Sequence, residues 1–288
     1  MPDFKISKRL FLALSLGLLT ANVIVWQEVA FFRDQNLKVI FFDVGQGDSI
    51  LIETPEKHLI LIDGGPDDSI LEKLNDMMPF WRRRINLIVL THPHADHLYG
   101  LINVLDRYRV DNILWNGVDC SEELCARWFS LLDKENQNVI IAQAGQRIKS
   151  KSVFLDVIYP IKSVYRYLPR DHNSASVVTK LTYGYNSFLL TGDILAPGEN
   201  EMMGYWQEYL ESNVLKVAHH GSRLSSQDDF LDFVQPELAV IQVGQDNRYG
   251  HPDQELLERL TLRSIDLRRT DKNQDVRIIS NGLNYYYE

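Results

Sequence analysis

The sequence predicts an α/β fold in which helices cover the faces of β-sheets. Short apolar runs of strand character alternate along the 288 residues with longer runs that have apolar residues at helical spacing. Polar residues, chiefly Gly, Asp and His, directly follow many of the apolar runs. Because open α/β architectures place ligands beyond the carboxyl ends of their strands, these polar residues are candidates for a binding or catalytic site.

The N-terminal segment has the composition of a membrane anchor. Residues 10–26 are apolar and uncharged, and three cations precede them: Lys5, Lys8 and Arg9. At about 1.5 Å per residue, this run is near the lower limit for crossing a hydrocarbon layer of roughly 30 Å. The positive flank predicts a cytoplasmic N-terminus. We therefore expect a stub and transmembrane helix at residues 1–36, and a single-pass protein of the cell membrane whose domain, residues 37–288, lies outside the cell.

Two alternatives remain for this segment. A cleaved signal peptide needs a small-residue cleavage site, for which Leu19-Thr20-Ala21 is a weak candidate. A buried core helix would not need the basic flank, nor the polar exit at residues 33–36. We favour the uncleaved anchor because the apolar run is long for a signal peptide.

The rest of the chain divides into short strands and a few helices. Strand character is expected in 11 apolar runs, at residues 37–42, 50–53, 58–62, 86–90, 110–115, 139–142, 153–159, 176–182, 188–191, 214–218 and 239–243. Helical spacing is found at residues 68–77, 98–108 and 121–132. This alternation favours a single large domain built on sheets.

The densest group of metal-ligating residues is Thr91-His92-Pro93-His94-Ala95-Asp96-His97, directly after the strand predicted at residues 86–90. Three of the 8 His of the chain lie in this run. His92 and His94 can converge on one ion, and Asp96 with His97 can reach a second ion beside it. Zinc, iron and manganese share imidazole and carboxylate ligands, so the run predicts a transition-metal site without identifying the metal.

Further candidates follow other predicted strands. Asp63 precedes two glycines at a strand end and is suited to orient a metal-bound imidazole. Asp193 follows Gly192 at another strand end. His219, His220 and His251 also come after strands, so that 6 of the 8 His share this position, and only His58 and His172 do not. This shared position predicts that they form one site.

The charge and cysteine content restrict the alternatives. The formal net charge of -9 excludes a global basic field for nucleic acid, so any such contact must be local. Cys120 and Cys125 are compatible with a local disulfide in an oxidising compartment and equally with two separate thiols. Their spacing does not match a zinc-binding Cys-x-x-Cys pair.

Six motifs together resemble the metallo-β-lactamase superfamily, and within it the soluble domain at the end of ComEC-type competence DNA-uptake proteins. They are FFDVGQGDS (41–49), LIDGG (61–65), THPHADH (91–97), TGD (191–193), LKVAHHGS (215–222) and NRYGHP (247–252). The histidine-rich motif is shared by many activities. The combination of this motif with FFDVGQGDS, LKVAHHGS and NRYGHP is more specific to the ComEC-type proteins.

The resemblance implies an αββα sandwich with two divalent metal ions, zinc or alternatively manganese, at one sheet edge. By position, His92 and His94 would bind the first ion, Asp96 and His97 the second, and Asp193 both. One of His219 and His220 would complete the second site, and we favour His219, with His220 facing the substrate. Asp48 and Asp63 would orient ligands, and catalysis is assigned to Asp96, His220 and His251, of which His251 is a ligand or a proton donor.

Two departures from the family pattern bear on these assignments. The histidine that many members place before the bridging aspartate is not clear here, because Asn173 and Ser176 match this branch better than His172 does. The ligand set of the first metal is therefore open. The family's multi-span permease is absent, so passage of DNA cannot be inferred for this chain.

The function we expect is cleavage of phosphodiester bonds, by a membrane-anchored nuclease that processes DNA at the cell surface, beside a separate membrane channel protein. Two metal ions can activate water and stabilise anionic oxygens. Arg248, Asn247 and Ser222 are candidate phosphate contacts, although Arg248 could equally form a salt bridge and Ser222 could cap a helix. The alternatives are hydrolysis of a small ester (a phosphocholine ester, a lactone or a thioester) and a non-catalytic partner of a transport channel.

Overall fold

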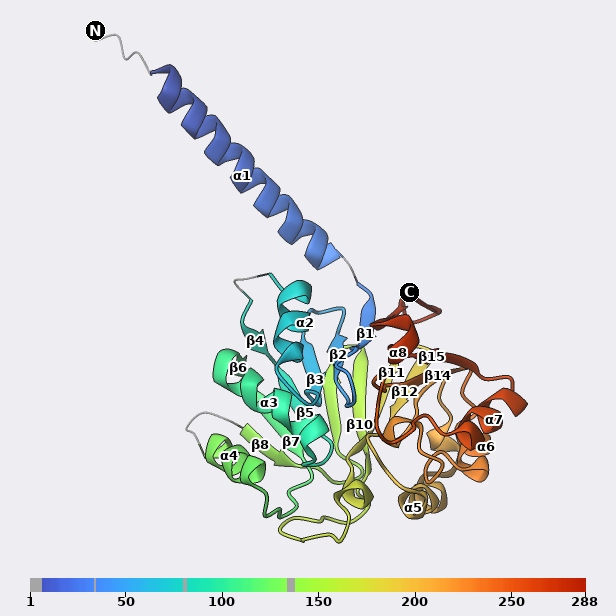
Figure 1. The fold of residues 1–288 in the computed structure, drawn as a ribbon. Coiled ribbons are helices and arrows are strands. Elements are labelled where there is room, and N and C mark those ends of the chain that lie inside the picture. The colour runs from blue at the N-terminus through green and yellow to red at the C-terminus, as the bar shows by residue number, and fades with distance from the viewer. Residues whose placement is uncertain (1–6, 34, 80–81, 134–137) are drawn as a thin grey trace.

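Two β-sheets lie face to face and carry helices on their outer sides (Figure 1). The structure is a computed structural model, and it describes residues 7–33, 35–79, 82–133 and 138–288. The predicted α/β class and the αββα layering are confirmed.

The first sheet has eight strands in the order β17-β16-β1-β2-β3-β5-β7-β8. Its strands are β1 (Leu37–Phe41), β2 (Ile50–Glu53), β3 (Leu59–Ile62), β5 (Leu87–Leu90), β7 (Asn112–Trp115), β8 (Asn138–Ile141), β16 (Val276–Ser280) and β17 (Tyr285–Tyr287). The run from β3 to β8 is parallel, whereas β1 pairs antiparallel with both β2 and β16. A separate parallel pair is formed by β4 (Arg84–Ile85) and β6 (Arg109–Val110).

The second sheet has seven strands in the order β15-β14-β13-β12-β11-β10-β9. Its strands are β9 (Arg147–Ser150), β10 (Val153–Tyr159), β11 (Val178–Tyr183), β12 (Asn186–Leu190), β13 (Val214–Lys216), β14 (Leu238–Ile241) and β15 (Asp266–Arg269). Strands β12 to β15 are parallel and β9 to β12 are antiparallel, so this sheet is mixed, like the first.

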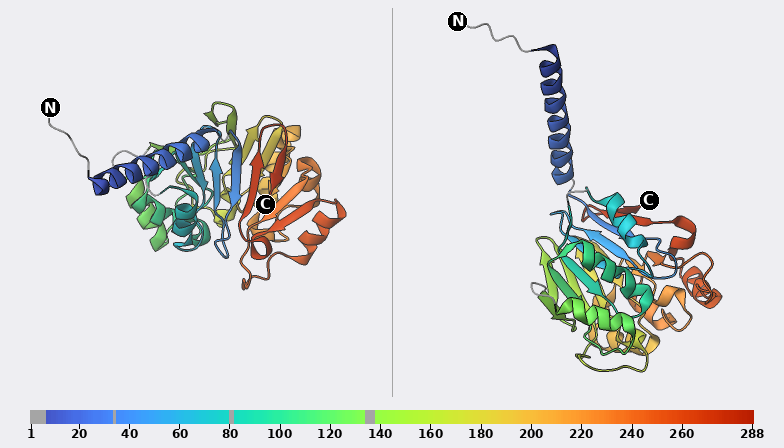
Figure 2. Two further views of the ribbon diagram at one scale, coloured as in Figure 1. Left: turned by 90° about the horizontal axis from the view of Figure 1, so that it is seen from above. Right: turned by 60° about the vertical axis from the view of Figure 1, so that its left-hand side comes forward.

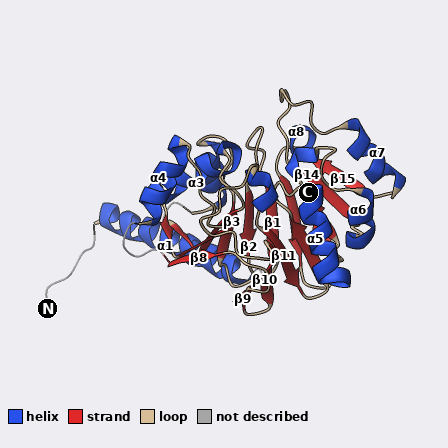
Figure 3. Ribbon diagram, turned by 90° about the horizontal axis from the view of Figure 1, so that it is seen from below, coloured by secondary structure: helices blue, strands red, loops and turns tan. Residues whose placement is uncertain are grey.

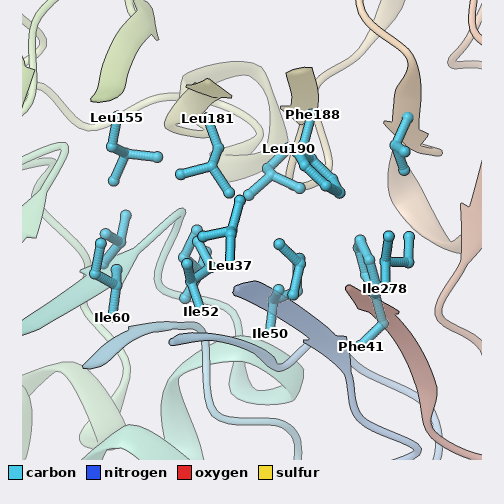
Figure 4. Packing of buried hydrophobic residues seen from close by; sticks show 14 of the residues in the cluster. Leu37, Phe41, Ile50, Ile52, Ile60, Leu155, Leu181, Phe188, Leu190 and Ile278 are labelled. Atoms are coloured by element: carbon cyan, nitrogen blue, oxygen red, sulfur yellow. The ribbon is translucent and has the colours of Figure 1, made fainter. Parts of the chain in front are cut away.

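The main core fills the space between the sheets (Figure 4). Leu155, Leu181 and Phe188 of the second sheet face Ile52 and Ile60 of the first. Successive side chains of a strand point to opposite faces, so Leu37, Val39 and Phe41 of β1 belong to this core and Ile40 to the outer one. This explains why so many of the strands are apolar throughout: each sheet is covered on both faces.

The helices form the two outer layers (Figure 3). On the first sheet lie α2 (Ser69–Met77), α3 (Ala95–Arg107) and α4 (Glu123–Leu132), which share one apolar cluster with it. On the second lie α5 (Ala196–Trp206), α6 (Asp228–Val234) and α7 (Gln254–Leu262). The short elements are α8 (Thr270–Asn273), η1 (His172–Ala175), η2 (Gln207–Leu210) and η3 (His219–Gly221).

Helix α1 (Lys8–Arg33) projects away from the sheets, as the right-hand view of Figure 2 shows. Many of its large apolar side chains are exposed, for example Leu12 at 72% and Leu18 at 70%. Over the part of the chain that the structure describes, none of the helices combines the length and the apolar character needed to cross a membrane. The predicted helix is thus confirmed, and its predicted passage through a bilayer is not.

Helix α3 begins three residues before the predicted start at residue 98. His94 has an extended backbone at the N-cap, and Asp96 lies in the first turn, where the helix dipole favours a carboxylate. The last three residues of the motif thus form the first turn of the helix, and residues 91–94 lead into it. The structure also decides between the two states that the sequence left open for the cysteines. Cys120 and Cys125 form a disulfide.

Candidate metal centre

The candidate residues gather where parallel strands of both sheets end. Asp63 follows β3, and the run from Thr91 to His97 follows β5. Asp193 follows β12, and His220 follows β13. Their placement at the carboxyl ends of the strands agrees with the sequence prediction.

Asp193 lies at the middle of this group. Its Oδ2 is 3.3 Å from His97 Nε2 and 3.5 Å from His220 Nε2. His220 Nε2 is also 3.3 Å from Asp96 Oδ2. Two overlapping sets of ligand atoms, each within 4.8 Å of one another, result: His92, His97 and Asp193, and Asp96, His97 and His220.

His92 and His94 lie at one end of the group. His92 Nε2 is 3.0 Å from His94 Nδ1, and the His92 ring centroid is 4.2 Å from that of His97. His92 is fully buried and His94 is partly exposed. The structure therefore brings together the four residues of the histidine-rich motif that we assigned to metal.

Hydrogen bonds fix which nitrogen each inner imidazole turns to the group. His97 Nδ1 is 2.8 Å from Asp63 Oδ2, and the other oxygen of Asp63 accepts the Thr91 amide proton at 2.8 Å. His220 Nδ1 donates to the carbonyl oxygen of Gln242 at 3.0 Å. In both rings Nε2 is left to face the carboxylates, and Asp63 lies where an orienting residue is expected.

Lys216 is a component of the centre that the sequence analysis missed. Its Nζ is 2.5 Å from Asp48 Oδ2 and 4.0 Å from Asp193 Oδ1, and both Lys216 and Asp48 are 1% exposed. The ammonium group also donates to the carbonyl oxygen of Gly192 at 3.0 Å. A lysine inside the apolar run before His219 and His220 was the available signal, because a fully buried cation requires a partner.

The ion pair between Lys216 and Asp48 makes some groups of residues weaker candidates for binding metal than others. Two other sets of residues also have ligand atoms within 4.8 Å of one another, and both contain Asp48. One combines it with Asp193 and His220, and the other with Asp63 and His97. The Asp48 carboxylate is already neutralised by Lys216, so these sets are weaker candidates for a metal ion. Asp48 therefore acts within the centre by holding Lys216 and contacting His220, whose Nδ1 is 3.4 Å from Asp48 Oδ1.

The carboxylates control the protonation of the imidazoles. Burial lowers the pKa of His220, but Asp193 and Asp48 outweigh burial and raise that pKa to about 10. Burial likewise opposes protonation of His97, and Asp193 and Asp63 raise its pKa well above the usual value. Burial raises the pKa of Asp193, but His220 and His97 hold it well below its ordinary value. The ionised carboxylates of the centre are thus stabilised by positive charge beside them, which the imidazoles carry when they are protonated.

A metal ion fits this donor set. His97 Nε2 and Asp193 Oδ1 are buried side-chain atoms without a hydrogen-bond partner. Buried polar atoms without partners are rare in folded proteins, and a bound cation would supply the missing contact. Imidazole nitrogens and carboxylate oxygens are donors that zinc and manganese accept.

His219 and His220 lie differently with respect to the centre. His220 is buried among Asp96, His97 and Asp193, whereas His219 belongs to neither overlapping set. His219 Nε2 is instead 3.4 Å from Asn173 Nδ2. The cause is local: both histidines have a positive φ of 53°, a sharp turn that directs the two adjacent rings apart. This geometry favours His220 over His219 as a ligand, and the metal and substrate roles of the two residues stay predictions.

The predicted substrate contacts separate into buried and exposed residues. Ser222 is buried, and its Oγ accepts the Leu224 amide proton at 3.3 Å. Asn247 uses its side chain on the backbone of its own turn, donating to the carbonyl oxygens of Gly244 and His251 at 3.0 and 2.7 Å. Both side chains thus contact the backbone of their own loops, and their role as phosphate contacts stays a prediction. Arg248 is exposed.

His251 and His172 lie at the outer side of the centre. The His251 ring is 5.8 Å from that of His219, and its Nδ1 is 3.5 Å from Asp253 Oδ2. The His172 ring is 5.5 Å from that of His94. Neither residue belongs to a described ligand set.

Comparison with known proteins identifies the family. The metallo-beta-lactamase superfamily pattern matches residues 42–245. The chain belongs to the metallo-beta-lactamase superfamily. Solved structures of this fold include YhfI from Bacillus subtilis, with a TM-score of 0.57 and 12% identity, covering 85% of this chain and 100% of that one. Zn(2+)-bound PqqB from Methylobacterium extorquens has a TM-score of 0.51 and 10% identity, covering 81% and 97%.

Curated relatives of this superfamily member include competence proteins. ComE operon protein 3 of Bacillus subtilis (strain 168) is 29% identical over 255 residues, which are 82% of this chain and 32% of that protein. Competence protein ComA of Neisseria gonorrhoeae is 30% identical over 238 residues, 81% of this chain and 31% of that protein. The chain spans less than a third of the length of either relative.

Proposed function

We propose that this superfamily member is a metal-dependent phosphodiesterase that cleaves nucleic acid. The observation that carries the proposal is the pair of ligand sets that overlap at His97, one of which contains Asp193. Such a pair suits two divalent ions, zinc or manganese, one near His92 and Asp193 and the other near Asp96 and His220, with His97 between them. His94, whose Nδ1 is 3.0 Å from His92 Nε2, lies beside the first of these positions. The likeness to proteins named for competence supports nucleic acid as the substrate.

When bound, the metal ions would lower the pKa of a water molecule and stabilise negative charge on the phosphate oxygens. The protein residues hold this arrangement in place. Asp193 presents one oxygen between His97 and His220, while Asp63 and the Gln242 carbonyl fix the rings of these two histidines. The reacting phosphate would therefore meet ligands that need no rearrangement.

The leaving alkoxide needs a proton, and we assign its donor to His219. The Asn173 amide lies 3.4 Å from His219 Nε2, so Nε2 accepts and the proton is on Nδ1. His219 Nδ1 has no hydrogen-bond partner among the described residues. This nitrogen is buried, so the proposal requires that the leaving oxygen enters the site to within hydrogen-bond distance of it, as a general acid needs.

A substrate panel tests the proposed reaction. The purified full chain, loaded with zinc or manganese, is expected to hydrolyse bis(p-nitrophenyl) phosphate and a labelled DNA oligonucleotide, and to lose both activities on chelation. A phosphocholine ester, a lactone and a thioester serve as comparison substrates. Turnover of one of these esters without cleavage of either phosphodiester would contradict the proposal and favour the small-ester alternative. Absence of any turnover would favour a non-catalytic role.

We further propose that α1 attaches the chain to the cell membrane, with the domain outside the cell and beside a separate channel protein. The support is the exposed apolar surface of α1, which carries no charge between Arg9 and Glu28, and the likeness to competence proteins. Fractionation of cells after crosslinking tests the attachment to the membrane and the contact with a channel protein. We expect the chain in the membrane fraction, joined to a channel protein. Recovery of the uncrosslinked chain in the supernatant would contradict it.

A further inference from the structure

The segment between β10 and η1 has an unusual surface. Residues 161–171, here named the rim loop, carry three exposed cations and three exposed apolar or aromatic side chains: Lys162, Arg166, Arg170, Tyr165, Tyr167 and Leu168. Its one carboxylate, Asp171, accepts the Asn173 amide proton at 3.0 Å. The rim loop is thus locally basic in a chain whose net charge is -9. In Figure 1 it lies at the end of the domain opposite to α1.

The cations of the rim loop have no acidic partner. Among the described residues, none of Lys162, Arg166 and Arg170 forms an ion pair. The Arg166 guanidinium lies 5.3 Å from the Tyr165 ring centroid, within the distance of a cation–π contact. An exposed Tyr at 53% and a cation without a carboxylate partner therefore stand side by side.

Backbone hydrogen bonds hold the rim loop against residues 117–119, which follow β7. The Arg166 amide donates to the carbonyl oxygen of Gly117 at 2.7 Å, and the Asp119 amide donates to that of Tyr167 at 2.9 Å. His172 Nε2 lies 3.3 Å from the Asp119 carbonyl oxygen, and its ring is 5.5 Å from that of His94. The end of the rim loop is thus at the outer side of the ligand set.

A second Arg–Tyr pair adjoins the centre through His251. Arg248 is 5.1 Å from the ring centroid of Tyr249, which is 56% exposed and stacks on His251 at 6.0 Å. His251 in turn neighbours His219, and His219 neighbours Asn173 next to His172. The contacts from Arg248 to Asn173 thus form a row of side chains beside the metal centre, and the rim loop continues from its end, because residue 171 precedes His172 and Asn173.

We propose that this row and the rim loop bind single-stranded nucleic acid, with bases on Tyr165, Tyr167 and Tyr249 and phosphates on Arg166 and Arg248. This inference rests on the proposed phosphodiesterase function and specifies its substrate. Bases stack on exposed aromatic rings only when they are unpaired, whereas arginines contact the backbone of any strand. Alternating aromatic and guanidinium groups beside a reactive centre therefore select a flexible single strand over a duplex.

Binding to fluorescein-labelled oligothymidylate, measured by anisotropy with the full chain in a chelator, tests the row without turnover. We expect the double variant Tyr165→Ala/Tyr167→Ala to raise Kd about tenfold or more, as loss of base stacking does. Arg166→Gln is expected to weaken binding and to reduce its dependence on salt. Tyr286→Ala is the matched control, because Tyr286 is 54% exposed on β17. It should bind like wild type.

Further probes make the result decisive. Wild type is expected to bind an abasic oligonucleotide and a DNA duplex at least several-fold more weakly than oligothymidylate. Equal metal content and equal melting temperature of the variants show that the centre and the fold are intact. Unchanged binding in the double variant, or preference for the duplex, would overturn the inference. Failure of wild type to hydrolyse bis(p-nitrophenyl) phosphate would instead overturn the proposed function, whatever the binding results.

Discussion

Asp193→Asn is expected to reduce phosphodiester hydrolysis by about a thousandfold, the equivalent of roughly 4 kcal/mol of transition-state stabilisation. Asp193 is buried, and its Oδ2 lies between His97 Nε2 at 3.3 Å and His220 Nε2 at 3.5 Å. An amide keeps the shape of the side chain but removes the negative charge from the middle of the ligand set. The measurement is kcat for bis(p-nitrophenyl) phosphate with saturating zinc or manganese.

The control for this variant is Asp229→Asn, which removes one carboxylate from an exposed position on α6. This change is expected to leave kcat and metal content as in wild type. If Asp193→Asn retained more than about a tenth of the wild-type kcat, the carboxylate would not act in the reaction. The bridging assignment would then be withdrawn.

Lys216→Met is expected to destabilise the fold by roughly 3–5 kcal/mol, the usual effect of removing one partner from a buried ion pair. Lys216 and Asp48 are both 1% exposed and 2.5 Å apart, so the variant leaves the Asp48 carboxylate without its cation. Methionine has a similar length and adds no charge. The measurement is the free energy of unfolding in denaturant, with a chelator present so that metal binding does not contribute.

The double variant Asp48→Asn/Lys216→Met isolates the pair. Replacing both partners removes the uncompensated charge, so the double variant should recover more than half of the stability lost in Lys216→Met. Lys57→Met serves as a comparison, because Lys57 is likewise nearly buried and pairs with Glu53 at 3.0 Å away from the metal centre. Strictly additive effects of Asp48→Asn and Lys216→Met would contradict direct coupling between them.

Much of the centre could be predicted because its residues follow strands. Apolar runs mark the strands, and the fold brings their carboxyl ends together, so His92, His97 and Asp193 were placed correctly in one group. Asp63 was predicted on the same grounds and lies 2.8 Å from His97. The αββα layering came from the resemblance, since alternating strands and helices alone fit several α/β architectures.

The remaining features depend on properties that residue patterns do not encode. The choice between His219 and His220 is made by two consecutive positive φ angles in η3. Lys216 was missed because a single lysine within an apolar run gives no sign of its partner, Asp48, which is 168 residues earlier in the chain. The rim loop has neither strand nor helix periodicity, and only the structure brings it to the metal centre.

The number of divalent ions held by the purified full chain is the most direct test of the central claim. Dialysis against zinc or manganese followed by elemental analysis should give two ions per chain in wild type and fewer in His220→Gln, because His220 contributes to one of the two overlapping ligand sets. A wild-type chain that retains no divalent ion, while remaining folded, would contradict a metal centre at this sheet edge.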